Sequence, residues 1–528
     1  MISLQQITYI HPNKELLFDQ ISLHIQQQHK IALIGNNGVG KSTLLKLIAG
    51  KIQPSSGQIH LDAKCYDVPQ HYGQYNTSTV AEALGISAKL KAFYEILDGR
   101  MTDEQLQILD DDWSIEERCQ KAFHYWGIEN IDLQQSMSRL SGGQKTKVFL
   151  SGVMIHEPDV VLMDEPSNHL DRTGRAKLYE FITQTNLTLL IVSHDRQLLN
   201  LLNTVYELSP KGIRIYGGNY DHYVEQKKIE SEALEQDIRS KEKALRKAKE
   251  VERETMERQQ KLDARGKKKQ EKAGLPTIVM NTLRNSAERS TAKIKDVHAE
   301  KLGHITNDLD MLRKEVSDTD RMKFGFDQSS LHKGKVLVDA KDINYAYAHS
   351  AIWNENVSFK IFSGDRYAIK GANGSGKTTL INMILGNLSP SNGTLFSAIR
   401  HAVYIDQDYS LIDSDLTVFE QASHFNSSAL QEHEIKIRLV RFLFDRDTWD
   451  KPCMALSGGE KMRLMLCCLT ISNQAPDIII LDEPTNNLDI QNMEILTSAI
   501  NDYKGTLLAI SHDEYFLDQI HIEQTIQL

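Results

Sequence analysis

Residues 35–42 read Gly-Asn-Asn-Gly-Val-Gly-Lys-Ser, and residues 371–378 read Gly-Ala-Asn-Gly-Ser-Gly-Lys-Thr. Both stretches have the pattern GxxxxGK[ST]. The apolar run Ile31–Ile34 before the first stretch predicts a buried strand, and Lys41–Ala49 predicts the start of a helix. Tyr367–Lys370 repeats the strand before the second stretch. A glycine loop between a strand and a helix is the context in which this pattern binds phosphate.

Three further segments recur in the same order. They are 140–144 and 456–460 (LSGGQ and LSGGE), 160–165 and 478–483 (VVLMDE and IIILDE), and 193–195 and 511–513 (SHD in both). The chain is therefore an internal repeat, with a first domain over 1–220, a linker over 221–330 and a second domain over 331–528. Short apolar strands mixed with helical stretches predict an α/β fold with a mostly parallel core sheet in each domain.

The two glycine loops predict two nucleotide sites. Their glycines let backbone N–H groups turn inward around phosphate oxygens, and the helix N-terminus adds a partial positive charge. Lys41 and Lys377 are expected to reach the β- and γ-phosphates, and the hydroxyls of Ser42 and Thr378 to ligate Mg²⁺. The loop residues expected to hold ATP are Gly35, Asn36, Asn37, Gly38, Val39, Gly40, Lys41, Ser42 and Thr43, and Gly371, Ala372, Asn373, Gly374, Ser375, Gly376, Lys377, Thr378 and Thr379.

The apolar runs 160–163 and 478–481 each end in Asp-Glu. Continuous apolar runs are typical of central parallel strands, and ligands bind at the carboxyl ends of such strands. We expect Asp164 and Asp482 to hold Mg²⁺, mostly through water. Glu165 and Glu483 are expected to orient and deprotonate the attacking water. The structural alternative is a helix N-cap, because a proline follows each pair.

Composition narrows the class of protein. The 528 residues carry a net charge of -10, which argues against general nucleic-acid binding. No apolar run approaches the roughly 18–20 residues that cross a bilayer, and the N-terminus lacks the pattern of a signal peptide. Five cysteines without paired CxxC spacing predict neither a disulfide framework nor a structural zinc. These features favour a cytoplasmic protein.

Taken together, the repeated motifs resemble one family, the ATP-binding cassette ATPases. Ser141 and Ser457 lie 23 and 25 residues before the respective aspartates, as in the signature sequence of that family. In the family, the signature contacts the γ-phosphate of ATP held by the opposite cassette. The resemblance therefore implies two composite sites, one formed by Lys41, Asp164 and Glu165 facing Ser457, and one formed by Lys377, Asp482 and Glu483 facing Ser141. The signature residues expected at ATP are Ser141, Gly142, Gly143, Ser457, Gly458 and Gly459.

The same resemblance assigns further residues. It implies a switch histidine that bonds the γ-phosphate at His194 and His512, a glutamine that senses metal and attacking water at Gln70 and Gln407, and a loop joining the two sites at 168–171 and 487–489. Tyr347 is the expected adenine-stacking residue of the second half, while Tyr9 and His11 remain alternatives in the first. No required catalytic group is degenerate in either half, which favours two hydrolysing sites.

The linker has a different composition from the domains. From His222 to Lys323 there are 25 basic and 20 acidic residues, against 36 and 51 in the remainder. Tyr223–Ala264 lacks proline and glycine and predicts one helix of about 60 Å. Arg265–Pro276 predicts a basic loop, and Arg284–Val316 predicts a returning helix. The linker is thus expected to be a long α-helical hairpin with a cationic tip.

Tandem cassettes joined by a charged helical hairpin resemble the ABC-F proteins over nearly the whole chain. The resemblance implies a ribosome partner, with rRNA and tRNA approached through the linker hairpin. It also implies an ATP-gated translation factor that works as a monomer, whose two cassettes close on each other. Basic side chains on a thin hairpin suit such a crevice, because they neutralise phosphates.

An arm inserted in the first cassette is a second feature of that family. Aligning Thr79–Leu84 with Thr417–Ala422 gives the first half 22 additional residues, which we place within Gly85–Trp113. That stretch carries three basic and seven acidic residues. A net charge of -4 is poor for RNA contact.

Three alternatives stay open on the sequence. A transporter ATPase subunit would need separate membrane partners, since this chain has no membrane domain, and would leave the basic hairpin without a purpose. A DNA-repair or chromosome-structure ATPase would split a cassette around a coiled coil or carry zinc spacing. Antibiotic resistance by ribosome protection lies within ABC-F and depends on the linker loop.

Overall fold

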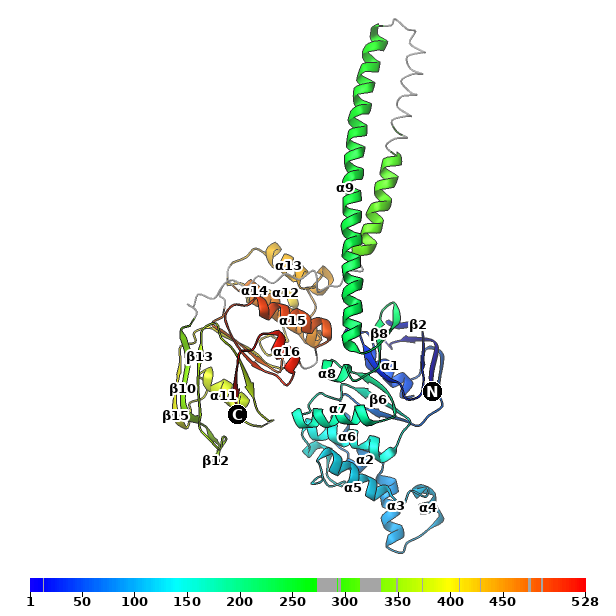
Figure 1. Cartoon of the computed structure of the whole chain (residues 1–528), viewed down its shortest axis with the longest axis vertical. Helices are drawn as coiled ribbons and strands as arrows, with labels where there is room; N and C mark the ends of the chain where they lie inside the picture. The colour runs from blue at the N-terminus through cyan, green and yellow to red at the C-terminus, as the bar shows by residue number, and fades with distance from the viewer. Residues whose placement is uncertain are drawn as a thin grey trace. The chain divides into compact units, whose positions relative to one another are not determined.

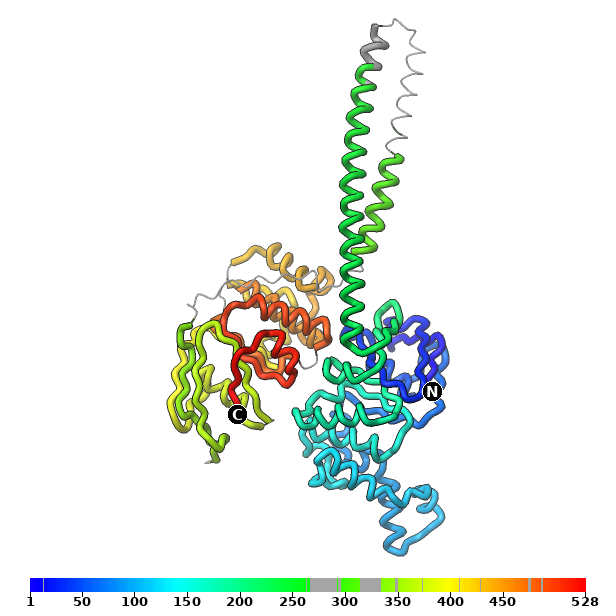
Figure 2. The backbone as a smooth tube through the Cα atoms, in the orientation of Figure 1, coloured from blue at the N-terminus to red at the C-terminus, as the bar shows by residue number. Residues whose placement is uncertain are grey.

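The computed structural model describes the chain except residues 13, 273–291, 293–295, 314–333, 348–349, 373, 408, 428, 473–475 and 486–487. The chain forms two compact units (Figures 1 and 2). One unit comprises Met1–Tyr223 with Met322–Leu528, and the other comprises Val224–Arg321. The first unit contains the two sequence repeats, which we call the first repeat (up to Tyr223) and the second repeat (from residue 334).

The first repeat is built on a six-stranded sheet with the order β5-β6-β7-β3-β8-β9. Its strands are β5 (Cys65–Val68), β6 (Val160–Asp164), β7 (Thr188–Val192), β3 (Lys30–Ile34), β8 (Thr204–Ser209) and β9 (Gly212–Gly217). Neighbouring strands are parallel except β8 and β9. Strands β6 and β7 are buried along their whole length. This explains their continuous apolar runs, since a parallel sheet is covered on both faces.

A second, antiparallel sheet and a set of helices complete the first repeat. The sheet has the order β2-β1-β4, with β1 (Ile2–Ile10), β2 (Leu16–Ile25) and β4 (Ser56–Leu61). The helices are α1 (Lys41–Ile48), α2 (Val80–Ala83), α3 (Ser87–Leu97), α4 (Asp103–Leu109), α5 (Ile115–Trp126), α6 (Gly142–His156), α7 (Arg172–Gln184) and α8 (Arg196–Leu199). The predicted strands at Ile31–Ile34 and 160–163 and the helix from Lys41 are confirmed.

The second repeat has the same plan. Its parallel sheet has the order β16-β17-β18-β14-β19, and its antiparallel sheet has the order β13-β10-β15. The strands are β10 (Val336–Asn344), β11 (Ala346–Tyr347), β12 (Ser350–Ala351), β13 (Val357–Phe362), β14 (Arg366–Lys370), β15 (Asn392–Ser397), β16 (Ala402–Ile405), β17 (Ile478–Asp482), β18 (Thr506–Ile510) and β19 (Gln524–Gln527). The helices are α11 (Lys377–Ile384), α12 (Val418–His424), α13 (Glu432–Arg441), α14 (Gly458–Ile471), α15 (Ile490–Asp502) and α16 (Glu514–Gln519). The predicted α/β class with mostly parallel core sheets is confirmed in both repeats.

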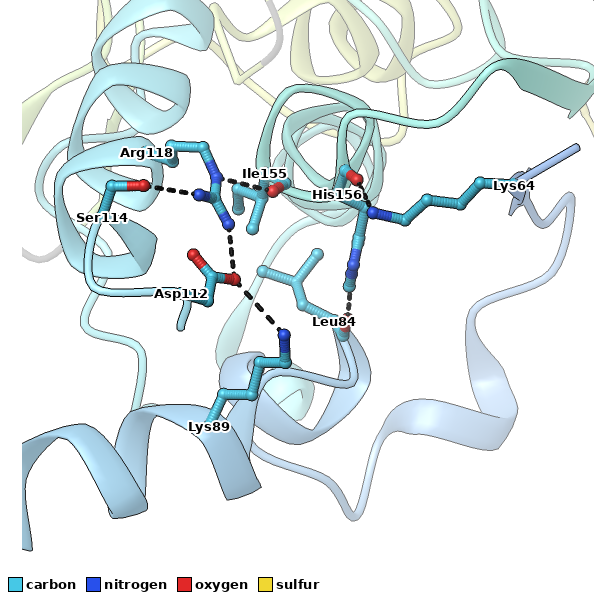
Figure 3. Close-up of polar contacts among 8 residues, drawn as sticks. All are labelled: Lys64, Leu84, Lys89, Asp112, Ser114, Arg118, Ile155 and His156. Carbon is cyan, nitrogen blue, oxygen red and sulfur yellow. Dashed lines mark hydrogen bonds and ion pairs between the residues drawn. The ribbon is translucent and has the colours of Figure 1, made fainter. Parts of the chain in front are cut away.

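Helices α3 and α4 occupy the stretch 85–113, where the first repeat is longer than the second (Figure 1). Both ends of this insertion are tied to the C-terminal end of α6 (Figure 3). Arg118 in α5 donates to Asp112 Oδ2 at 2.7 Å and to the carbonyl of Ile155 at 2.9 Å. Nε2 of His156 lies 2.7 Å from the carbonyl oxygen of Leu84. Leu84 precedes the insertion and Asp112 lies at its end. The last turn of α6 therefore holds both ends of the insertion together, and we call these two ends the root of the insertion.

The second unit is a helical hairpin. Its first helix is α9 (Tyr220–Lys272), of which the residues from Val224 on belong to this unit, and the returning helix covers 296–313. The two lie side by side (Figure 2), and ion pairs join Lys241 to Asp308 at 2.6 Å and Glu242 to Arg313 at 2.8 Å. These pairs are exposed, so each contributes little to stability, but together they define the antiparallel register.

The prediction for the hairpin tip was partly wrong. It ended the first helix at Ala264 and began a loop at Arg265, whereas α9 continues through Gly266 to Lys272. A glycine costs a helix only about 1 kcal/mol, and the Lys, Gln and Glu residues after it are good helix formers. The rest of the predicted tip, 273–276, and both ends of the predicted returning helix lie outside the described residues. Within the part of the chain that the structure describes, no helix is long and apolar enough to span a bilayer.

Candidate active sites

The first glycine loop joins β3 to α1, as the sequence predicts. Gly35, Gly38 and Gly40 all have positive φ, at 151°, 82° and 102°. A Cβ atom on Gly35 would lie 2.4 Å from the carbonyl oxygen of Leu208, and one on Gly40 would lie 2.6 Å from Cζ of Phe18. The backbone conformation and the close approach therefore both require glycine at Gly35 and Gly40.

The lysine of each loop folds back onto its own backbone. Lys41 Nζ donates to the carbonyls of Gly35 at 2.6 Å and Asn36 at 3.1 Å. Lys377 Nζ donates to the carbonyl of Gly371 at 2.9 Å in the second repeat. Lys41 is buried, and burial lowers the pKa of its ammonium group. A buried ammonium that has only neutral carbonyl partners on its loop is suited to an incoming phosphate oxygen.

The two glutamates have the same unusual geometry. Glu165 and Glu483 are buried and have φ values of 52° and 49°, in the left-handed region. Each backbone N–H donates to the neighbouring strand at 2.8 Å, to Val192 in β7 and to Ile510 in β18. Non-glycine residues hold such a conformation at a cost of about 1–3 kcal/mol, and such strain concentrates at functional sites. The repetition of this geometry argues against the simple helix-cap interpretation.

A histidine lies beside each glutamate. His194 Nε2 is 3.3 Å from Glu165 Oε1, and His512 Nε2 is 3.4 Å from Glu483 Oε1. Burial raises the pKa of Glu165 to about 8 and that of Glu483 to about 7. Burial also lowers the pKa of His194 to about 3 and that of His512 to about 4. Each pair is therefore a neutral imidazole beside a carboxyl group that titrates near neutral pH, a suitable range for a general base.

The oxygen donors expected for Mg²⁺ gather in the first repeat. The Ser42 side chain lies near the buried Asp164 carboxylate and opposes the rise in pKa that burial gives this group. Two hard oxygen ligands side by side fit a cation that is otherwise held by phosphate oxygens and water. Among the described residues, no three His, Cys, Asp or Glu side chains form a metal site by themselves. A cation here would thus depend on the nucleotide for its remaining ligands.

The signature serines begin long helices. Ser141 and Ser457 are exposed N-caps of α6 and α14. Each forms a capping box with the residue three positions on, so its hydroxyl sits among the first free N–H groups of its helix. A Cβ on Gly143 would lie 2.7 Å from the carbonyl oxygen of His169, and one on Gly459 would lie 2.2 Å from Nδ2 of Asn492. The signature glycines therefore allow the close packing of α6 and α14 on the segments that follow the glutamates.

Other residues expected at the sites are placed as follows. Gln70 is half-buried and Gln407 is exposed, and each follows the edge strand next to its aspartate. The rings of Tyr9 and His11 contact each other edge-on at 5.4 Å, which does not distinguish the two alternatives for adenine stacking. Asn373 and the side chain of Tyr347 lie outside the described part of the chain.

Sequence reasoning missed the aromatic residues beneath the glycine loops. Phe18 in β2 lies under Gly40. Trp353 in the second repeat donates from Nε1 to the carbonyl of Ser375 at 2.7 Å. Both side chains are buried. The sequence contains one indication of these residues. Each repeat has an aromatic residue at nearly the same distance before the last glycine of the loop, 22 residues before Gly40 and 23 before Gly376.

The raised pKa values predict a pH-dependent stability. A glutamate with an unfolded pKa of 4.5 and a folded pKa of about 8 stabilises the fold fully only below pH 4.5, and this contribution is lost as pH rises through the folded value. The depressed pKa values of the histidines act in the opposite direction, below pH 6.5. Between pH 6.5 and 8 we expect the nucleotide-free protein to lose roughly 2 kcal/mol more than the Glu165→Gln/Glu483→Gln variant. Urea unfolding of both proteins across this pH range measures the difference. If the free energy of unfolding changed equally with pH in the two proteins, the raised pKa values of the glutamates would be contradicted.

Two glycine loops, each with a lysine, an Asp-Glu pair and a histidine at the ends of neighbouring parallel strands, define a tandem nucleotide-binding P-loop protein. Comparison with known proteins agrees. The family model described as ABC transporter matches residues 18–168 and 354–486. The chain is 31% identical to the putative ATP-binding protein YdiF of Bacillus subtilis (strain 168), with 96% of this chain and 77% of that protein aligned. It is 28% identical to ABC transporter F family member 5 of Arabidopsis thaliana, over 98% of this chain and 74% of that protein.

Solved structures show the same fold. A TM-score of 0.60 relates the chain to the archaeal ribosome recycling factor aABCE1, solved in complex with the archaeal ribosomal stalk protein aP1. The identity is 19%, with 98% of this chain and 86% of that chain covered. The chain belongs to the ATP-binding cassette family, as a tandem-cassette protein of the ABC-F type.

Proposed function

We propose that the chain hydrolyses ATP at two sites formed by its cassettes (1–220 and 331–528) and acts on the ribosome as an ATP-gated translation factor. The observation that carries the hydrolytic part is the strained, buried glutamate beside a neutral histidine in both repeats. Its occurrence twice supports two working sites rather than one working and one inactive site.

Glu165 and Glu483 would accept the proton of the water that attacks the γ-phosphate. An acceptor that titrates near neutral pH is effective in this role, because it is available as a base and binds the proton strongly enough. The neutral imidazoles of His194 and His512 would each donate one hydrogen bond to the γ-phosphate. Lys41 and Lys377 would exchange their loop carbonyls for β- and γ-phosphate oxygens.

Mg²⁺ would be held by Ser42 and Asp164 in the first repeat and by Thr378 and Asp482 in the second, with Gln70 and Gln407 nearby. The ion supplies charge neutralisation for the phosphates when it is bound. The exposed helix N-termini at Ser141 and Ser457 support their use as anion contacts for the nucleotide of the opposite cassette.

The ribosomal part of the proposal rests on the hairpin and on the relatives. The linker is the one basic segment of an acidic chain, and its first helix alone, with 53 residues, extends about 80 Å. The structural relatives include the ribosome recycling factor aABCE1 and a model of ribosome-bound archaeal Pelota and ABCE1. A long thin hairpin with basic residues suits a crevice lined by RNA phosphates.

Sedimentation through sucrose tests this proposal. The Glu165→Gln/Glu483→Gln variant is expected to bind ATP without hydrolysing it, so in lysate with ATP we expect it to sediment with ribosomes. Adding Lys41→Ala and Lys377→Ala should remove the binding, since the closed form needs ATP. A variant that stays off the ribosomes, or that sediments with membranes, would show the proposal to be wrong.

The linker is tested in the same assay by changing Lys267, Lys268 and Lys269 to glutamine. If these lysines contact phosphates, the salt dependence of binding should weaken by a slope of about 2–3. An unchanged slope would place the contact elsewhere. Drug susceptibility of cells expressing the protein with and without Arg265–Pro276 separates a housekeeping role from antibiotic resistance.

A further inference from the structure

The strand beside each metal-binding aspartate differs between the repeats at one register position. Asp67 in β5 is in register with the residue two positions before Asp164 in β6. Tyr404 in β16 is in register with the residue two positions before Asp482 in β17. Residues two apart on a strand share a face, so Asp67 and Tyr404 are equivalent diagonal neighbours of the two aspartates.

The contacts at this position are different in kind. In the second repeat, the Tyr404 hydroxyl donates to Asp482 Oδ2 at 2.8 Å. In the first repeat, Asp67 has no hydroxyl to offer, and its carboxylate lies 2.6 Å from Lys51 Nζ. The Asp67 side chain is only 13% exposed, whereas that of Lys51 is 45% exposed. Burial raises the pKa of Asp164, and the negative charge of Asp67 adds to that rise.

We propose that positions 67 and 404 make the two nucleotide sites unequal in their dependence on Mg²⁺, so that the first site gains more affinity for ATP from the cation than the second. This inference rests on the proposed binding of ATP with Mg²⁺ at both sites. Asp67 and Tyr404 are positioning residues, which act through Asp164 and Asp482.

The physical reason lies in the surroundings of the two aspartates. A hydrogen bond donated to a carboxylate withdraws negative charge from the oxygen that the cation or its water needs. When the cation binds, this hydrogen bond must be shared or broken. A second carboxylate near the first increases the attraction for a divalent cation, but this applies to both repeats, since Asp67 lies near Asp164 and Asp406 lies near Asp482. Lys51 moderates this field, but its ammonium group is near solvent and is screened by it. The hydrogen bond from Tyr404 is therefore the difference that favours the first site.

Calorimetric titration of ATP into the full chain tests the inference without measuring turnover. Both glutamates are changed to glutamine to prevent hydrolysis. Lys377→Ala then isolates the first site, and Lys41→Ala isolates the second. The measured quantity is the ratio of the dissociation constant in EDTA to that in Mg²⁺. Since a hydrogen bond to a charged group corresponds to about a tenfold change in an equilibrium constant, we expect the ratio to be about tenfold larger at the first site.

Two conservative variants identify the cause. Tyr404→Phe should raise the ratio at the second site severalfold, and Asp67→Asn should lower it at the first. Tyr367→Phe is the matched control, because its hydroxyl donates to the carbonyl of Lys360 at 2.6 Å in the same repeat. Thermal melting establishes that each variant is folded. Equal ratios at the two sites, or a Tyr404→Phe ratio within twofold of its parent, would overturn this inference alone. Absence of ATP binding at both sites would overturn the proposed function as well.

Discussion

Replacing Glu165 and Glu483 together with glutamine is expected to lower ATP turnover by about 10²–10⁴-fold, the usual contribution of a general base. Glutamine keeps the size of the side chain and adopts the same backbone conformation, but it cannot accept the proton of the attacking water. Affinity for ATP should change only within a few-fold, because neither glutamate is expected to contact the nucleotide directly. Phosphate release and equilibrium ATP binding, measured on the same preparation, separate the two quantities.

Glu157→Gln is the matched control for this prediction. Glu157 also has a positive φ, 47°, but it is exposed and caps the end of α6 away from the glycine loop. Its replacement should leave turnover unchanged. If the double variant kept more than about one tenth of the wild-type rate, proton transfer would not depend on these carboxylates.

Replacing Gly40 or Gly376 with alanine is expected to have the second large effect. The φ values are 102° and 89°, and the added Cβ would lie 2.6 Å from Phe18 Cζ or 2.7 Å from Ile352 Cγ2. Backbone strain and overpacking together should cost about 2–4 kcal/mol of stability. The loop must also move to relieve the collision, so ATP affinity at the altered site should fall by at least about tenfold, as expected when phosphate-binding N–H groups are displaced.

Gly50→Ala separates strain from collision. Gly50 has a φ of 71°, yet a Cβ there would meet no atom within 4 Å. It lies just beyond α1 and outside the glycine loop. We expect a stability loss of about 1 kcal/mol from the backbone alone, with ATP binding unaffected. Urea unfolding and ATP titration of the three variants provide the comparison. A Gly40→Ala protein as stable as Gly50→Ala would contradict the packing argument.

The elements next to the repeated motifs could be predicted because their signals are local. An apolar run followed by a glycine loop or an Asp-Glu pair is read directly from the chain, and β3, α1, β6 and β17 lie where the sequence indicates. The features that sequence reasoning missed depend on neighbours distant in the chain. The Tyr404–Asp482 hydrogen bond requires the register of β16 on β17, and the support of Gly40 requires β2 to pass beneath the loop.

The hairpin shows a different limit. Gly266 and Gly274 in a run of basic residues indicate a loop by composition, but a helix that has already extended over 46 residues adds another turn at low cost. The helix therefore passes Gly266. The residues assigned to adenine stacking remain predictions, because an aromatic residue near a loop has too many packing uses to be assigned from sequence alone.

Helix α6 carries the signature serine at one end and the root of the α3–α4 insertion at the other. Its 15 residues make a rod of about 22 Å. Tilting such a rod by about 5° around its C-terminal end moves the opposite end by about 2 Å, which is enough to break a hydrogen bond. A partner that shifts the insertion root by a small angle would thus change the reach of Ser141 without touching a nucleotide. Movement of the insertion would therefore be transmitted along the rigid helix α6 to the signature serine.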